Sequence, residues 1–329
     1  MPDSAPEPTP DPARGVTLEP APATLATRAK GWFLISRVPF LSVGILPYLL
    51  GTAIAAYDGA EIDAVTFWLG MSGVLLIMLA TYFNGEYYDI AEDSISTELG
   101  RNPFAGGSGG VVDGLLPAHH ARRAGIIAAM AATVIGLVLA FVVGTGPLTI
   151  PMGLFGLIAG FFYSAPPFRW VQRGIGEIFI GICYGWLPIA VGYYLQNPQL
   201  PAVLWWASLP VGITIFNVIY MNEYPDYEGD VAAGKRNLLV RVGREHGVWI
   251  YVAAAFLAPA TFVWAIGHGV PQWIWPWYAG VTALSLVPTV MMVTGKWSVR
   301  KLLEPMCGIT IIVNLATTAV LIAAFLLEG

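Results

Sequence analysis

Long apolar runs separated by short polar connections dominate the sequence from about Trp32 to the C-terminus. Crossing a bilayer takes about 20 helical residues, with a range of roughly 17 to 25, and the runs meet that length. Prolines inside them predict kinks, because neighbouring helices can satisfy the backbone groups that a proline frees within a membrane. We therefore predict an all-α membrane protein with nine spanning helices, at 38–57, 64–85, 123–144, 147–163, 174–195, 201–221, 246–268, 272–294 and 305–327.

Composition agrees with this pattern. Of the 329 residues 56% are hydrophobic and only 11% are charged, whereas soluble domains carry about 25% charged residues. The net charge of −5 and the lack of a basic stripe exclude a nucleic-acid partner and leave the lipid bilayer. Residues 1–30 are rich in Pro, Ala, Thr and acids, which predicts a disordered cytosolic tail before a transmembrane domain at 31–329.

Positive charge alternates along the chain. All 16 Lys and Arg residues fall in the N-terminal segment and in every second connection. Because cytoplasmic loops hold the Lys and Arg excess, we expect the N-terminus and the cation-bearing loops inside and the C-terminus outside a bacterial or archaeal cell membrane. The segments without a cation are 58–63, 145–146, 196–200, 269–271 and the C-terminus.

Two acidic stretches with the pattern E-x-x-D-x-x-x-D follow the second and sixth predicted spans. On a helix, offsets of three and seven place all three carboxylates on one face. One such pattern is common in solvated loops, but two in the same register predict a site for a Mg²⁺-bound diphosphate, since Mg²⁺ takes oxygen ligands from carboxylates and substrate phosphates. The expected metal ligands are Glu86, Asp89 and Asp93 in the first ridge and Glu223, Asp226 and Asp230 in the second.

Candidate phosphate-binding groups follow each ridge. Arg101 opens the glycine-rich segment R-N-P-F-A-G-G-S-G-G, whose backbone N–H groups could face an anion or which could be a flexible linker. Lys235 and Arg236 follow Asp230 by five and six residues. An arginine fork and a lysine point charge suit diphosphate oxygens, although a positive-inside role also explains cations here.

The connection at 163–177 reads Y-S-A-P-P-F-R-W-V-Q-R-G-I-G-E. Consecutive prolines stop a helix, so a shaped cytoplasmic turn is predicted. Glu177 then begins an apolar run, where an acid either faces a cavity or a partner or stabilises the start of the helix.

Together these motifs resemble the UbiA superfamily of intramembrane aromatic prenyltransferases over about 35–325. The resemblance implies a helical bundle around a central cavity that opens sideways to lipid and is capped by the two motif loops on the cytoplasmic side. The segments R-N-P-F-A-G-G-S-G and G-K-R-N-L-L-V-R-V-G are most similar to those of the 1,4-dihydroxy-2-naphthoate polyprenyltransferases of menaquinone synthesis. A polyprenyl diphosphate donor, an aromatic acceptor and Mg²⁺ are thereby implied.

The resemblance also implies residue roles. Asp89, Asp93, Asp226 and Asp230 would serve catalysis at the Mg²⁺-diphosphate site. In the first motif Glu86 stands where the family usually has Asp, and Gly85 separates it from the Asn. The resemblance implies that Asn84 serves this site together with the four aspartates. The other substrate-binding candidates are Asn222, Arg101, Lys235 and Arg236, with Tyr163, Arg37 and Glu177 as candidates for steering the acceptor.

Other functions stay open at this stage. A 4-hydroxybenzoate acceptor would keep its carboxylate and need a fixed cation, for which Arg37 or Arg169 could serve. An ion-coupled transporter could use both ridges as a cation path, but the ridges lie at the edges of spans and not at their middle. The D-G-x-x-A-R pattern expected of a phospholipid-type transferase is absent from the sequence.

Overall fold

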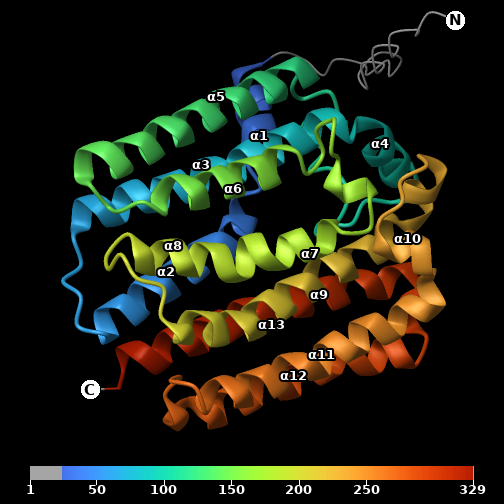
Figure 1. The fold of residues 1–329 in the computed structure, drawn as a ribbon. Coiled ribbons are helices and arrows are strands. Elements are labelled where there is room, and N and C mark those ends of the chain that lie inside the picture. Colours follow the sequence, from blue (N-terminus) through green and yellow to red (C-terminus); the bar gives the residue numbers. More distant parts are fainter. Residues whose placement is uncertain (1–23, 329) are drawn as a thin grey trace, which may run out of the picture.

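The computed structural model describes residues 24–328, and within that range every regular element is helical. The long helices run side by side along one direction to form a bundle (Figure 1). The α-helices are α1 (Leu25–Ile35), α2 (Ser42–Tyr57), α3 (Ala64–Tyr88), α4 (Ile90–Leu99), α5 (Ala118–Leu137), α6 (Thr149–Phe161), α7 (Gly176–Ile180), α8 (Leu187–Tyr194), α9 (Ala202–Ala232), α10 (Leu238–Val242), α11 (Arg244–Ile266), α12 (Trp275–Val293) and α13 (Arg300–Leu326).

Glycines set the closest helix contacts in the bundle. A Cβ atom on Gly51 of α2 would lie only 1.9 Å from the backbone oxygen of Ile189 in α8. In return, a Cβ atom on Gly192 of α8 would lie 2.2 Å from the backbone oxygen of Tyr48 in α2. Small residues allow such close backbone approach between membrane helices, which pack mainly by van der Waals contact. The pair α2–α8 is therefore fixed by reciprocal glycines.

The prediction of an all-α membrane protein is confirmed. Among residues 24–328, eight helical stretches are long and apolar enough to cross a membrane. The fourth predicted span, 147–163, corresponds to α6, which has only 13 residues. Such a helix rises about 20 Å, less than the roughly 30 Å hydrocarbon core of a bilayer. The count of nine spans therefore stays a prediction.

Most of the predicted tail, 1–23, lies outside the described residues. Helix α1 begins at Leu25, so the last residues of the range 1–30 are helical in the structure. The division into a disordered tail and a domain at 31–329 stays a prediction.

Both ridges lie at the end of the bundle that carries α4 and α10, at the right of Figure 1, whereas the C-terminus lies at the opposite end. The second ridge is part of one continuous helix, because α9 runs to Ala232, well past the predicted end at 221. The first ridge is not on one helix. Helix α3 ends at Tyr88 and α4 begins at Ile90, so the chain bends at Asp89 in the middle of the motif.

Candidate active site

A cavity lies between the two ridges. Its water-accessible interior is about 200 Å³. It brings together side chains from α3, α4 and α9 with those of the loops that follow α1, α4, α6 and α9. The predicted site residues on its wall are Arg37, Asp89, Asp93, Tyr163, Asn222, Glu223, Asp226, Asp230 and Lys235.

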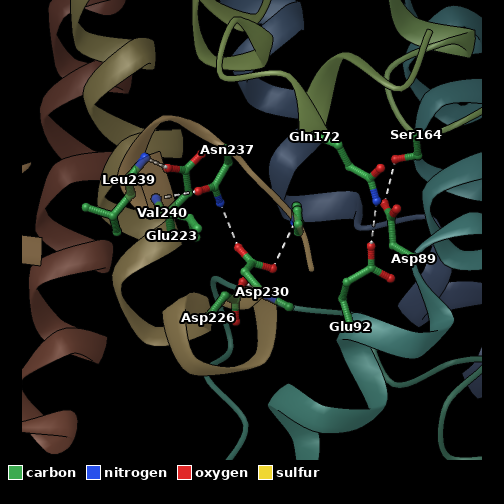
Figure 2. A network of polar contacts seen from close by, with 12 residues as sticks. Asp89, Glu92, Ser164, Gln172, Glu223, Asp226, Asp230, Asn237, Leu239 and Val240 are labelled. Carbon is green, nitrogen blue, oxygen red and sulfur yellow. Dashed lines mark hydrogen bonds and ion pairs between the residues drawn. The ribbon is translucent and has the colours of Figure 1, made fainter. Parts of the chain in front are cut away.

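Asp89 is held by the loop that joins α6 to α7. The hydroxyl of Ser164 donates to its Oδ2 at 2.5 Å (Figure 2). Nη2 of Arg169 lies 3.3 Å from its Oδ1. The same Arg169 nitrogen lies 3.3 Å from Oε1 of Glu92, one turn further along the chain. A single guanidinium thus contacts two acids of the α3–α4 bend.

Asp93 projects into the cavity without such a cation close by. Burial, together with the negative charges of Glu86, Asp89 and Asp226, raises its pKa well above the usual range. Arg37 opposes this shift only in part. A divalent cation in the cavity would relieve the repulsion and favour the ionised carboxylate.

In the second ridge, Asp230 is held by the loop that follows the ridge. Nζ of Lys235 lies 3.0 Å from Oδ1 of Asp230, and Nδ2 of Asn237 donates to Oδ2 of Asp230 at 2.7 Å (Figure 2). Asp226 instead accepts the backbone N–H of Gly106 at 2.6 Å. The glycine-rich loop that follows the first ridge therefore reaches across to the second.

Lys235 keeps its positive charge in this setting. Burial alone would lower the pKa of its ammonium group, but the carboxylates of Asp230, Asp89 and Glu92 raise this pKa well above its usual range. The loop after α9 thus carries a fixed cation on the cavity wall, beside both ridges.

The first glutamate of each ridge binds the loop that follows that same ridge. Oε1 of Glu86 accepts the backbone N–H of Ser108 at 2.9 Å and lies 3.4 Å from Arg37. Oε2 of Glu223 accepts the backbone N–H of Leu239 at 3.4 Å. A loop-holding role is therefore shared by both glutamates, and metal ligation by either of them stays a prediction.

Glu177, like the first glutamate of each ridge, accepts a backbone N–H of a neighbouring segment. It is buried, and its Oε1 accepts the backbone N–H of Leu238 at 2.8 Å. It thereby joins the start of α7 to the first residue of α10. Acceptor steering by Glu177 stays a prediction, and these contacts support a role in placing the loop that carries Lys235.

Asn84 is not on the cavity wall. It is fully buried against α5, where a Cβ atom added to Gly125 would lie 3.0 Å from its Oδ1. Asn84 precedes Asp89 by five residues, which turns it by about 140° on a helix, whereas Asn222 precedes Asp226 by four and is turned by only about 40°. The extra glycine in the first motif thus points Asn84 away from the site.

Two predicted cations also lie off the wall. Arg101 forms a double contact with exposed Asp113, from Nη2 to Oδ1 at 2.6 Å and from Nη1 to Oδ2 at 2.7 Å. This pairing lowers the pKa of the Asp113 carboxyl. Arg236 is exposed, and its backbone oxygen accepts from Nε of Arg241 at 2.7 Å. A direct diphosphate contact by Arg101 or Arg236 stays a prediction.

Sequence reasoning missed several side chains of the site. Ser164 and Arg169 lie in the turn at 163–177, and Asn237 lies in the motif after the second ridge, but none was connected with the acids. Tyr82 lines the cavity and had a detectable signal. It precedes Asp89 by seven residues, so it lies on the same face of the helix.

A second cavity adjoins the first inside the bundle. Its water-accessible interior is about 110 Å³, and its wall is almost wholly apolar, built by α3, α5, α6 and the segment from α7 to α8. Several glycines widen it, among them Gly136 and Gly153, where an added Cβ atom would have no described atom of another residue within 4 Å. The two cavities share wall residues Thr81, Tyr163, Ile180 and Tyr184.

The oxygen donors on the wall of the acid-lined cavity fit a metal ion whose coordination shell is completed by oxygens of a bound substrate. Within residues 24–328, no three His, Cys, Asp or Glu side chains converge closely enough to hold a metal ion by themselves. Oδ1 of Asn222 is buried on the wall without a hydrogen-bond partner in that range. This donor set suits a hard cation held by one or two carboxylates and phosphate oxygens, and not an all-protein metal cage.

The fold and the cavities define a multi-pass helical membrane protein with an acid-lined chamber at one end of its bundle and an apolar chamber behind it. The profile of the UbiA prenyltransferase family matches residues 44–303. The chain therefore belongs to the UbiA prenyltransferase family, and it is an enzyme, as the sequence motifs predicted.

Named relatives agree. The chain is 24% identical over 265 residues to the 1,4-dihydroxy-2-naphthoate octaprenyltransferase of Bacillus subtilis (strain 168), covering 79% of this chain and 80% of that protein. It is 24% identical to the 2-carboxy-1,4-naphthoquinone phytyltransferase of Synechocystis sp., covering 69% and 71%. A solved UbiA homologue from Archaeoglobus fulgidus, bound to GPP and Mg²⁺, superposes with a TM-score of 0.58 at 17% identity, over 88% of this chain and 99% of that one. At that identity the structural likeness shows the fold alone.

Proposed function

We propose that this prenyltransferase moves a polyprenyl group from an allylic diphosphate to 1,4-dihydroxy-2-naphthoate in a Mg²⁺-dependent reaction of menaquinone synthesis. One observation carries the proposal: an acid-lined cavity with a fixed lysine lies directly beside an apolar cavity, and the two share wall residues. A charged head group beside a long hydrocarbon tail matches that arrangement.

The head-group end is formed by the two ridges. Asp89, Asp93, Asp226 and Asp230 would hold Mg²⁺ together with the diphosphate oxygens, and the Asn222 oxygen is free to join them. When bound, Mg²⁺ stabilises the negative charge that develops on the leaving diphosphate. Lys235 stands on the same wall and adds its own positive charge to the departing group. A Mg²⁺-bound diphosphate at this end is supported by the A. fulgidus homologue of the same fold, whose structure contains GPP and Mg²⁺.

The tail end is the apolar cavity. Its wall offers hydrocarbon contacts and excludes water from the allylic carbon once the C–O bond to the diphosphate breaks. The diphosphate leaves with the bonding electron pair, so the allylic carbon becomes electron-deficient. A dry wall lets a ring carbon of the acceptor, and not water, supply the new electron pair.

The acceptor assignment rests on the named relatives in B. subtilis and Synechocystis. The ring carbon that bears the carboxylate would form the new C–C bond, and the carboxylate would leave as CO₂. The electron pair of the broken C–C bond restores the aromatic ring, which yields the hydroquinone form of a demethylmenaquinone. No oxidant is needed for this step.

The proposal is tested by incubating the purified protein with Mg²⁺, an allylic diphosphate and a panel of acceptors, with products identified by mass. We expect a prenylated product of 1,4-dihydroxy-2-naphthoate that lacks the carboxylate. Transfer only to 4-hydroxybenzoate, with the carboxylate retained, would overturn the acceptor and keep the prenyl transfer. No transfer to any acceptor would overturn both.

We also propose the orientation given by the cations, with the ridges and the N-terminus facing the cytoplasm and the C-terminus outside. Figure 1 supports it, because the ridge-bearing end and the C-terminus are at opposite ends of the bundle.

A further inference from the structure

We infer that α1 lies flat in the surface of the bilayer, where Arg28 and Lys30 bind the phosphate groups of acidic phospholipids. The surface in question belongs to neither cavity, because no residue of α1 lines either of them. The inference therefore does not depend on which donor or acceptor the enzyme uses.

Helix α1 is separate from the spanning helix that follows it. It ends at Ile35, and the backbone at Arg37 is left-handed, with a φ angle of +43° that no continuous α-helix contains. The next long helix, α2, begins only at Ser42. Figure 1 shows α1 running across the direction of the long helices. Its 11 residues rise about 16 Å, roughly half of the hydrocarbon core, so α1 cannot cross a bilayer by itself.

One face of α1 is fixed against the protein. A Cβ atom on buried Gly31 would lie 2.7 Å from Cγ of Leu116, which precedes α5. Ile35 is fully buried, and a Cβ atom on Gly110 would overlap its side chain. The segment from Gly110 to Leu116 continues the glycine-rich loop that contacts both ridges. This packing determines which face of α1 points away from the protein.

The face that points away is apolar. Leu25 is 86% exposed and Phe33 is 60% exposed, and Ala29, also exposed, lies between them. Spacings of four residues place these three side chains in one stripe along the helix. Trp32 borders the stripe, packs edge-on against Phe83 of α3 and is itself partly exposed. Tryptophan is enriched where a membrane meets water, and an apolar stripe of this kind is buried in that boundary.

Two cations flank the stripe. Arg28 and Lys30 are the sequence neighbours of Ala29, so they are turned by about 100° to either side of it. Both are exposed, and neither forms an ion pair within residues 24–328. Long cationic side chains can extend along apolar surface and bring their charge to the head groups. A helix with an apolar stripe between such cations is typical of binding to an acidic lipid surface.

The first turns of α5 show that α1 lies at the right depth. Arg123 is exposed there, whereas Ile127 and Met130, one and two turns further, are 60% and 57% exposed. The exposed surface of α5 thus changes from charged to apolar within about one turn, as expected where head groups give way to hydrocarbon. Through Gly31 and Leu116, α1 packs beside the chain that enters this boundary.

Depth-dependent fluorescence quenching tests the position of α1. A fluorophore is attached to Ala29→Cys in full-length protein whose Cys183 and Cys307 are replaced by alanine, reconstituted in phosphatidylcholine vesicles that contain phosphatidylglycerol. We expect the strongest quenching from lipids with a nitroxide just below the head group. Glu98→Cys, on exposed α4, should be quenched best by aqueous acrylamide, and Met130→Cys by a nitroxide deep in the hydrocarbon. Quenching at Ala29 that matches either control would overturn the inference.

The cations are tested by changing the lipid. Adding phosphatidylglycerol to phosphatidylcholine should lower acrylamide quenching at Ala29→Cys by about fivefold or more, since each surface cation gives about a fivefold preference for an acidic surface. Acrylamide is neutral, so the charge of the vesicle does not alter its local concentration. The double change Arg28→Gln and Lys30→Gln should abolish this response.

The matched control is the double change Lys296→Gln and Lys301→Gln, which removes the same charge from two other exposed lysines and should keep the response. An equal loss in both double variants would mean a general effect of net charge and would overturn the site. No effect of phosphatidylglycerol on the parent protein would overturn it as well. Thermal unfolding shows that each variant is folded, and because no readout uses turnover, failure here is distinct from failure of the proposed function.

Discussion

The backbone N–H of Gly106 lies 2.6 Å from Oδ2 of Asp226, so the loop that follows the first ridge is bonded to the second ridge. The same loop is bonded to the first ridge through Ser108 and Glu86. One glycine-rich segment thus spans both acidic motifs. A change in either ridge is therefore expected to disturb the geometry of the other.

The ridges should be needed together for catalysis. We expect Asp93→Asn and Asp226→Asn each to lower turnover by about 100-fold or more, since each removes a charge that would hold the metal and its diphosphate. Glu98→Gln is the matched control, because Glu98 is an exposed acid on the same helix as Asp93. The measurement is initial rate at saturating Mg²⁺. Full activity of Asp226→Asn would contradict the two-ridge site.

Lys235 and Arg236 are neighbours in sequence but differ in position. Lys235 lines the cavity and pairs with Asp230, whereas Arg236 is exposed. We expect Lys235→Gln to raise the KM for the allylic diphosphate by about tenfold or more, since a charge-assisted contact is lost. Arg236→Gln should have a clearly smaller effect. Equal effects would show that both cations reach the diphosphate, as the sequence motif alone predicted.

The apolar cavity should set which donors fit. Gly153 lines it and faces open space, so Gly153→Leu would fill the cavity without moving its walls. We expect turnover with octaprenyl diphosphate to fall by about tenfold relative to turnover with geranyl diphosphate, because the leucine occupies space that only the longer tail needs, and overpacking costs about 1–3 kcal/mol. Gly280→Leu is the control, since Gly280 also faces open space but lies exposed on α12. An unchanged donor ratio would place the tail elsewhere.

Orientation can be read by thiol labelling. In a background with Cys183 and Cys307 replaced by Ala, a cysteine at exposed Gln199 should react with an impermeant reagent added to intact cells. A cysteine at exposed His119, beside the cluster of cations at the start of α5, should react only after the cells are opened. The reverse pattern would invert the protein in its membrane.

The spans could be predicted from sequence because hydrophobic length and proline tolerance are local properties. The prediction for 64–85 lies within α3, and that for 272–294 closely matches α12 and the short turn before it. The end of α9 could not be placed, because its last turns are polar and are held by tertiary contacts such as those of Asp226 and Asp230. Apolar length contains no information about such contacts.

Part of the candidate site could be predicted from local spacing, whereas contacts between distant segments could not. Spacing placed Asp226 and Asp230 on one face, and α9 does present both to the cavity. Spacing also grouped Asn84 with the site, although a count of residues per turn would have separated it from Asp89. The pairing of Arg169 with Asp89 joins positions that are far apart in sequence, and no local pattern specifies it.

Arg37 and Arg169 both have a left-handed backbone conformation, which affects how the chain would respond to selection for stability. Each such conformation costs about 1–3 kcal/mol of folding free energy, a cost that glycine would avoid. Replacing either arginine by glycine should therefore offset the loss of its ion pairs in the free energy of unfolding, while removing a guanidinium that lines the cavity at Arg37 or that holds Asp89 at Arg169. If the reaction depends on these two guanidinium groups, stability and activity are opposed at both positions, and a search for thermostable variants would tend to discard them.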